Sequence, residues 1–232
     1  MARGYFVTGT DTGVGKTTVT VALIHALRAQ GLKVVGMKPV ASGCEWVDGE
    51  FVNGDVRALR AAANVLADPA LVNPYSFAPA IAPHIAAAQA GIEIRLETLT
   101  SAYAALAQVA DVVVVEGVGG FCVPLGADLD TAGLARALDL PVILVVGMRL
   151  GCLNHALLTM EAIRRRRLNW AGWVANELEP DMPALAENLA ELKMRLPVPC
   201  LGRMQNSRQM GCAEGREPRP FLMEWFEGPP GT

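Results

Sequence analysis

The chain has 232 residues, of which 52% are hydrophobic and 19% are charged, and its formal net charge at pH 7 is −3. A chain of this length forms one domain or at most two small ones, and it can bury a full core without disulfides or metal ions. The composition excludes disorder over most of the length. The slightly acidic balance excludes a generic nucleic-acid-binding protein, which would carry a strongly basic surface.

The apolar runs and the cysteines indicate a cytoplasmic protein. The longest apolar run, 140–148, falls well short of the roughly 20 residues that a membrane-spanning helix needs. Residues 1–4 lead directly into a strand-like stretch, without the apolar core of a signal peptide. The five cysteines form no CxxC pair, which favours reduced thiols over a disulfide framework or a zinc site. We therefore expect neither a membrane nor a nucleic acid as partner.

Strand-like and helix-like segments alternate along the chain, which predicts a mostly parallel α/β sheet flanked by helices in one domain, residues 1–204. Short β-branched apolar runs predict buried strands, and apolar residues at helical spacing predict helices. Two long connections, 43–54 and 73–83, are expected to be functional loops, and 205–232 reads as a Gly, Pro and Arg-rich tail. In chain order the expected elements are a strand over 5–8, a helix over 17–30, a strand over 33–37, helices over 55–66 and 95–109, strands over 111–115 and 141–146, a helix over 155–166, a strand over 170–175, a helix over 184–196 and a short strand within 197–201.

The strongest motif is Gly-Thr-Asp-Thr-Gly-Val-Gly-Lys-Thr-Thr at 9–18, between the first expected strand and the first expected helix. That context is typical of a phosphate loop, whose backbone N–H groups and helix N-terminus bind a polyphosphate. Lys16 would reach the β- and γ-phosphates, and the Thr17 hydroxyl would ligate Mg2+. Gly9 stands one residue earlier than in the common form of the motif. The motif predicts a P-loop NTPase-like fold; the alternative is a glycine-rich turn that caps a helix.

Three further charged residues stand at element ends. Glu116 ends the run 112–115, Lys38 ends the second expected strand, and Asp55 begins the second expected helix. Since the carboxyl ends of parallel strands line the ligand crevice, Glu116 and Lys38 can face the same ligand as the phosphate loop. Glu116 stands where such proteins place a metal carboxylate, usually Asp. Taken singly, each has a plainer interpretation: an acidic strand end, a solvated lysine, or a helix N-cap.

Together these segments resemble the dethiobiotin synthetase family. The resemblance rests on the phosphate loop, on Lys-Pro-Val-Ala-Ser-Gly at 38–43 and on Val-Glu-Gly-Val-Gly-Gly at 115–120, and it covers roughly residues 4–202. It also includes segments at 73–75, 83–84, 141–147, 150–155 and 172–176. The resemblance implies a homodimeric, Mg2+-dependent ligase of biotin biosynthesis that uses ATP. One amine of 7,8-diaminopelargonic acid would take up CO2 as a carbamate, the γ-phosphate of ATP would be transferred to it, and the second amine would close the ureido ring.

The resemblance also implies roles for individual residues. Lys38 and Lys16 would be the catalytic cations between two anionic reactants, and Thr17, Asp55 and Glu116 would bind the metal. Asn176 would read the adenine edge. The remaining nucleotide-binding residues would be Gly13, Val14, Gly15, Thr18, Gly117, Val118 and Gly119. The diaminopelargonate substrate would contact Thr12 and Ser42. Its far carboxylate would be bound by four residues of the other subunit, Gly151, Cys152, Leu153 and Asn154.

The sequence departs from the family pattern in three places. Val118 stands where alanine is usual, Ala82 stands where serine is common, and 203–206 replaces an apolar residue and proline that lie along the nucleotide base. Because of the last change, we expect weak discrimination among nucleoside triphosphates.

Two other functions are compatible with a phosphate loop. A switch ATPase of the partitioning or septum-positioning type would carry a second lysine near the start of the loop, and residues 9–12 contain none. A catalytically silent regulatory domain would have no reason to keep Lys16, Thr17, Lys38, Asp55 and Glu116 together.

Overall fold

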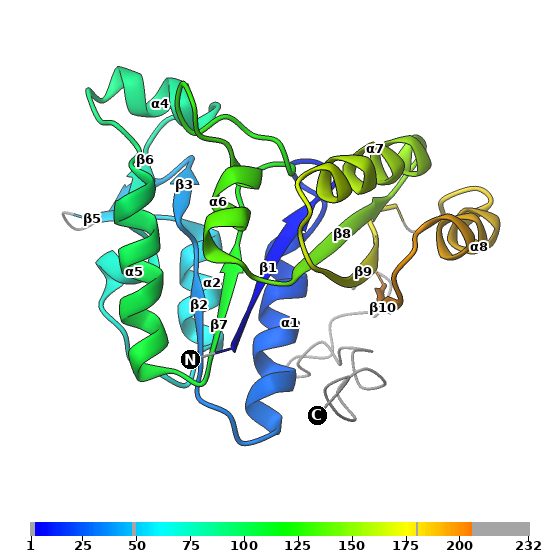
Figure 1. The fold of residues 1–232 in the computed structure, drawn as a ribbon, viewed down its shortest axis with the longest axis horizontal. Coiled ribbons are helices and arrows are strands. Elements are labelled where there is room, and N and C mark those ends of the chain that lie inside the picture. The colour runs from blue at the N-terminus through cyan, green and yellow to red at the C-terminus, as the bar shows by residue number, and fades with distance from the viewer. Residues whose placement is uncertain (1–2, 48–49, 180, 206–232) are drawn as a thin grey trace.

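A six-stranded parallel sheet forms the centre of the fold in the computed structural model, which describes residues 3–47, 50–179 and 181–205. Neighbouring strands follow the order β10-β9-β8-β1-β7-β2, and every pairing in this sheet is parallel. All carboxyl ends therefore lie at one edge, at the upper end of β1 and β7 in Figure 1. The strands are β1 (Arg3–Gly9), β2 (Val34–Met37), β7 (Val112–Glu116), β8 (Val142–Met148), β9 (Trp170–Glu177) and β10 (Cys200–Met204).

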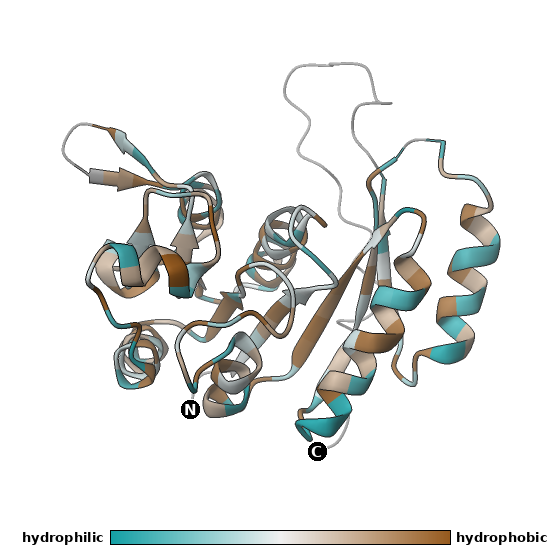
Figure 2. Ribbon diagram, turned by 90° about the horizontal axis from the view of Figure 1, so that it is seen from above, coloured by the Kyte–Doolittle hydropathy of each residue, from teal (hydrophilic) through white to brown (hydrophobic). Residues whose placement is uncertain are grey.

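Helices cover both faces of the sheet, because the central strands are apolar on both sides. Every residue of β7 and β8 is buried. One face packs against α1 (Lys16–Ala29) and α2 (Gly54–Ala62). The other packs against α5 (Leu96–Val109), α6 (Thr131–Leu138), α7 (Cys152–Arg165) and α8 (Leu185–Arg195). In Figure 2 the central strands are brown, whereas the outer helices alternate brown and teal.

A small subdomain lies above the β2 end of the sheet. In it β3 (Val40–Ser42) pairs in parallel with β6 (Tyr75–Phe77), and β4 (Glu45–Val47) pairs with β5 (Glu50–Val52) as an antiparallel hairpin. One short helix, α4 (Pro83–Gln89), completes it, whereas α3 (Pro69–Val72) packs against α5 and β2 of the main body. Both connections that the sequence predicts as long loops thus contain short strands: 43–54 folds back on itself as the β4–β5 hairpin, and 73–83 contains β6, which pairs with β3.

The predicted order of the main elements is confirmed, with differences at the ends. The helix predicted over 55–66 ends at Ala62, since Ala63 has extended backbone. The helix predicted over 155–166 begins earlier, at Cys152, and the last strand is shifted toward Met204. The sequence prediction also missed α6, which is short and rich in small residues. In the described part of the chain, every helix lacks the length and apolar character needed to cross a membrane. The predicted tail lies outside the described residues, except Gln205.

Candidate active site

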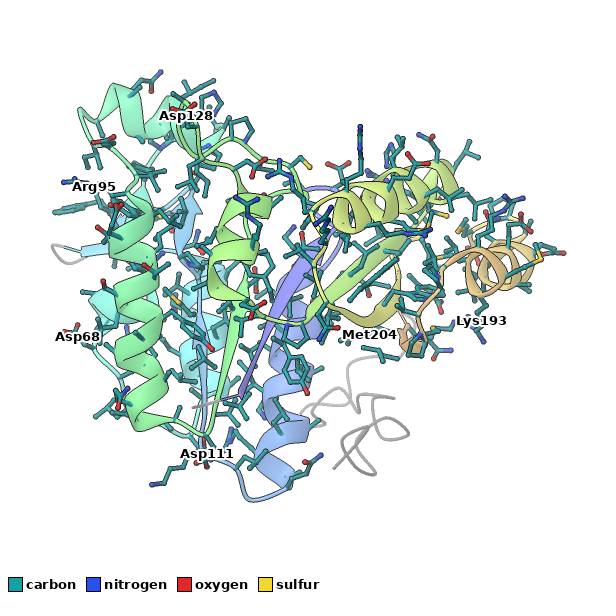
Figure 3. The ribbon with its side chains drawn as sticks, in the orientation of Figure 1. Asp68, Arg95, Asp111, Asp128, Lys193 and Met204 are labelled. Carbon is teal, nitrogen blue, oxygen red and sulfur yellow. The ribbon has the colours of Figure 1, made fainter. Side chains whose placement is uncertain are left out.

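The phosphate loop connects β1 to α1 at the carboxyl edge of the sheet, as the sequence predicts. Figure 3 gives the orientation: Asp111, just before β7, marks the amino edge, and Asp128 lies toward the opposite edge, where the loops gather. Gly15 is the N-cap of α1 and has φ 85°, and α1 has no side-chain cap at this end. The first backbone N–H groups of the helix are therefore available to an anion.

Asn176, at the end of β9, supports this loop directly. Its Nδ2 donates a hydrogen bond to the Val14 carbonyl at 2.8 Å. A Cβ atom at Gly15 would lie 2.0 Å from the same Nδ2, so only glycine fits at this position. The Oδ1 of Asn176 accepts no hydrogen bond from the described residues, and this leaves an amide acceptor beside the loop.

Lys16, the first residue of α1, is nearly buried, and its Nζ donates to the Asp11 carbonyl at 3.1 Å. Burial and, to a lesser extent, the positive charge of Lys38 lower the pKa of Lys16 to about 8, although the nearby carboxylates oppose this shift. The lysine is thus mostly protonated at neutral pH but less firmly than a surface lysine. An anionic ligand would stabilise its charged form.

Lys38 is the centre of a buried ionic cluster. The residue is 3% exposed, and its Nζ donates to Glu116 Oε1 at 2.5 Å, to Asp55 Oδ2 at 3.0 Å and to the Gly117 carbonyl at 3.2 Å. Burial alone would lower the pKa of Lys38, but the charges of Glu116 and Asp55 outweigh it and raise the pKa. Lys38 is therefore a fixed cation, and its interpretation as a solvated strand-end lysine is wrong.

Asp55 and Glu116 reach this cluster from different elements. Asp55 lies in the first turn of α2 and Glu116 ends β7, where its side chain is fully buried. Burial opposes ionisation of Asp55, but the charge of Lys38 prevails, so the pKa of this carboxyl lies below its usual range. Asp55 is not the N-cap of α2, because Asn53 holds that position.

The cluster fits a magnesium ion. Thr17 Oγ1 donates to Glu116 Oε1 at 3.0 Å, which brings all three predicted metal ligands together. Glu116 Oε2 is buried without a hydrogen-bond partner in the described structure, as expected for an oxygen that meets a cation. Mg2+ is commonly held by one or two carboxylates together with substrate phosphates and water. The described residues contain no group of three or more His, Cys, Asp or Glu that could hold a metal.

Two asparagines that the sequence analysis did not assign a role hold the cluster in place. Asn53 Oδ1 accepts from the backbone N–H groups of Asp55 and Val56, and its Nδ2 donates to the Ser42 carbonyl. Asn73 Nδ2 donates to the Lys38 carbonyl at 2.6 Å. An Asn before the Gly-Asp start of a helix is a recognisable N-cap signal, so Asn53 could have been found. Nothing local indicates the contact of Asn73.

The predicted substrate residues lie at the same edge but do not all touch the cluster. Ser42, at the end of β3, has a buried Oγ without a partner among the described residues. Thr12 is in the phosphate loop, and its N–H donates to Asp11 Oδ1. The residues predicted to receive the far carboxylate, Gly151 to Asn154, form the N-cap and first turn of α7, which has no side-chain cap. In the described part of the chain, no hydrogen bond or ion pair joins them to Lys38 or Glu116.

The segment that departs from the family pattern continues β10 beside Asn176. Met204 pairs in register with Asn176 and is buried in the core. Arg203 Nε donates to Glu177 Oε1. This segment therefore has a buried methionine and an ion pair where an apolar residue and proline are usual in the family.

Comparisons with known proteins place the chain in context. The family model for the AAA domain matches residues 3–213. An ATP-dependent dethiobiotin synthetase BioD from Nitrosospira multiformis is 55% identical over 205 residues, covering 87% of this chain and 88% of that protein. The same enzyme from Aromatoleum aromaticum is 55% identical over 202 residues, covering 86% and 89%.

Solved structures that resemble the chain confirm the expected fold class. The septum site-determining protein MinD of Pyrococcus horikoshii, complexed with Mg-ADP, matches with a TM-score of 0.55 and 19% identity over 88% of this chain and 82% of that one. A cobyrinic acid a,c-diamide synthase from Mycobacterium smegmatis, with bound ADP and magnesium, matches with a TM-score of 0.54 and 22% identity over 90% and 88%. At these identities the likeness concerns the fold alone.

Proposed function

The chain belongs to the AAA-domain family and, within it, to the ATP-dependent dethiobiotin synthetases, and from this premise we propose that it closes the ureido ring of dethiobiotin in biotin biosynthesis. Its substrates are 7,8-diaminopelargonic acid, CO2 and ATP, and its products are dethiobiotin, ADP and phosphate. The observation that supports this reaction best is the buried Lys38, which stands with two carboxylates beside the phosphate loop.

The reaction brings two anions together, and the site supplies the opposing charge. A carbamate formed on one substrate amine must approach the γ-phosphate of ATP, and the repulsion between them is relieved only by cations placed at the gap. Lys16 would bind the phosphates of the nucleotide, because it begins the helix that follows the phosphate loop. Lys38 would bind the carbamate and the transferring phosphoryl group, because it directly follows β2, which pairs with β7 on the side away from β1, and it contacts Glu116 at the end of β7.

Lys38 must exchange a hydrogen bond to act in this way. Its three N–H groups are all donated, to Asp55, Glu116 and the Gly117 carbonyl. The last is the longest, at 3.2 Å, and its acceptor is uncharged, so an anionic substrate oxygen can replace it with a gain in attraction. Lys38 then holds the carbamate oxygen while its bonds to the carboxylates keep the ammonium in place.

Thr17, Asp55 and Glu116 would hold Mg2+, which neutralises charge on the phosphates when it is bound. The unpartnered Oε2 of Glu116 supports this assignment. The nucleotide would lie on Gly13, Val14, Gly15 and Thr18, with Gly117, Val118 and Gly119 beside it and the free Oδ1 of Asn176 toward the base.

The diaminopelargonate would lie between two copies of the chain. Ser42 and Thr12 would contact its amine end, and the uncapped first turn of α7 in a second copy, Gly151 to Asn154, would receive its far carboxylate. A homodimer in the cytoplasm is therefore part of this proposal.

The test is ATP hydrolysis measured with and without diaminopelargonate and bicarbonate. We expect ADP release to require both, with one dethiobiotin formed per ADP. ATP hydrolysis at the same rate with and without diaminopelargonate and bicarbonate would indicate a switch ATPase. The absence of hydrolysis under every condition would indicate a silent regulatory domain. Either result would contradict the proposal.

A further inference from the structure

Asp11 places a negative charge inside the phosphate loop. The loop binds a polyphosphate through backbone N–H groups and Lys16, so a carboxylate on the loop itself opposes the ligand by like-charge repulsion. Asp11 is about half exposed, and its Oδ1 accepts from the Thr12 N–H at 2.7 Å. That hydrogen bond, and then the hydrogen bond and positive charge of Arg149, hold the pKa of Asp11 below its usual range despite partial burial.

Arg149 is the counter-charge of Asp11. Its Nη2 donates to Asp11 Oδ2 at 2.5 Å. Among the ion pairs of the described residues, this one alone includes a residue of the loop between β1 and α1. Arg149 follows β8 directly and precedes the N-cap of α7, Gly151. The pair thus joins the phosphate loop to a segment far away in the sequence.

The end of β8 also packs closely on the loop, so Arg149 is presented to Asp11 by a rigid element. A Cβ atom at Gly147 would lie 2.8 Å from Val14 Cγ1, and the Thr10 N–H donates to the Val145 carbonyl at 3.0 Å. The backbone carbonyl of Asp11 accepts from Lys16 Nζ. Asp11 is therefore fixed through its carboxylate and through its carbonyl, and the second contact touches a catalytic lysine.

We propose that Arg149 is a positioning residue for ATP. It neutralises Asp11 and holds the loop in the conformation in which Lys16 and the N-terminus of α1 meet the phosphates. Arg149 acts through Asp11 and makes no contact of its own with the nucleotide. The inference rests on the proposed function only for the identity of the ligand, ATP.

The test compares the ATP affinity of single and double variants by calorimetry, with Mg2+ and without the amine substrate. Arg149→Gln leaves Asp11 unneutralised, and we expect ATP affinity to fall roughly tenfold at low salt, with the loss shrinking at high salt. Asp11→Asn combined with Arg149→Gln removes both charges, and affinity should return to within about threefold of the parent. Arg149→Lys keeps the charge and should bind ATP nearly as the parent does.

Arg166→Gln is the matched control. Arg166 forms an ion pair of similar length with Asp130 and is about equally exposed, but it caps the far end of α7 and contacts no loop residue. We expect unchanged ATP affinity in this variant. Thermal unfolding of every variant identifies any loss of fold, and the Arg149→Lys protein remains informative if Arg149→Gln is unfolded.

Two results would overturn the inference. Unchanged ATP affinity in folded Arg149→Gln would show that Asp11 needs no counter-charge. A double variant that binds ATP as weakly as Arg149→Gln would show that Arg149 contacts the nucleotide itself. Because ATP binding is measured without ring closure, neither result depends on whether dethiobiotin is formed.

Discussion

Replacing Lys38 with glutamine removes the cation at the centre of the buried cluster while keeping most of the side-chain length. The ammonium is preorganised by Glu116 and Asp55 and largely shielded from water, and such a group contributes about 3 kcal/mol or more to the transition state. We therefore expect the rate of dethiobiotin formation at saturating substrates to fall roughly a hundredfold or more. The affinity of Lys38→Gln for the nucleotide should fall less than that of Lys16→Gln, since Lys16 also binds ATP in the ground state.

The same change has a cost for stability, which must be separated from catalysis. Glu116 is fully buried, and removing its cationic partner costs about 3 kcal/mol of unfolding free energy without added metal. Adding Glu116→Gln removes the unpaired charge, so the double variant should regain stability and stay inactive. Lys33→Gln, at an exposed position before β2, is the control and should change neither property. Near-parental product formation by folded Lys38→Gln would refute the assigned role of Lys38.

Three further predictions follow from the site. Asp55→Asn or Glu116→Gln should greatly reduce ring closure while circular dichroism shows an intact fold, and normal activity in both would contradict the metal assignment. Product assays with each nucleoside triphosphate should show weak discrimination; an ATP preference of about 100-fold, or about 2.7 kcal/mol, would show that other residues rebuild the base pocket. ATP affinity should fall as pH rises through about 8, because burial lowers the pKa of Lys16 to about 8 and the charged form binds phosphate. Since the pKa of Lys16 in the folded protein lies below its value in the unfolded chain, the Lys16 contribution to the free energy of unfolding should rise between about pH 8 and 10.5. Lys16→Gln should remove the Lys16 contribution to the pH dependence of ATP affinity and of stability. An unchanged pH dependence of both in this variant would contradict the assignment.

The main features of the site could be predicted because parallel strands have their carboxyl ends at one edge. That geometry alone brings Lys38 at the end of β2 and Glu116 at the end of β7 toward the loop after β1. The sequence pattern likewise identifies the strands that are buried on both faces, such as 112–115. In both cases the signal is local, and a general rule of sheet topology supplies the rest.

The parts that sequence reasoning missed depend on contacts between distant segments. The pairing of β3 with β6 joins two three-residue strands, too short to show a periodicity of their own. Asn73 reaches the Lys38 carbonyl, and Arg149 reaches Asp11 from the end of the neighbouring strand β8, far away in the sequence. A lone asparagine or arginine in a sequence carries no sign of such a partner, so only the folded arrangement reveals these roles.

In the proposed reaction the γ-phosphate of ATP passes to a carbamate oxygen. The most direct measurement follows that oxygen, using 18O-labelled CO2 in unlabelled water with ATP, Mg2+ and diaminopelargonate, quenched before the label exchanges. One carbamate oxygen should leave with the phosphate, and the other should remain in the ureido carbonyl. We predict one 18O atom in the released phosphate for each dethiobiotin formed. Phosphate without label, alongside labelled dethiobiotin, would show that water attacks ATP and that ring closure follows another path.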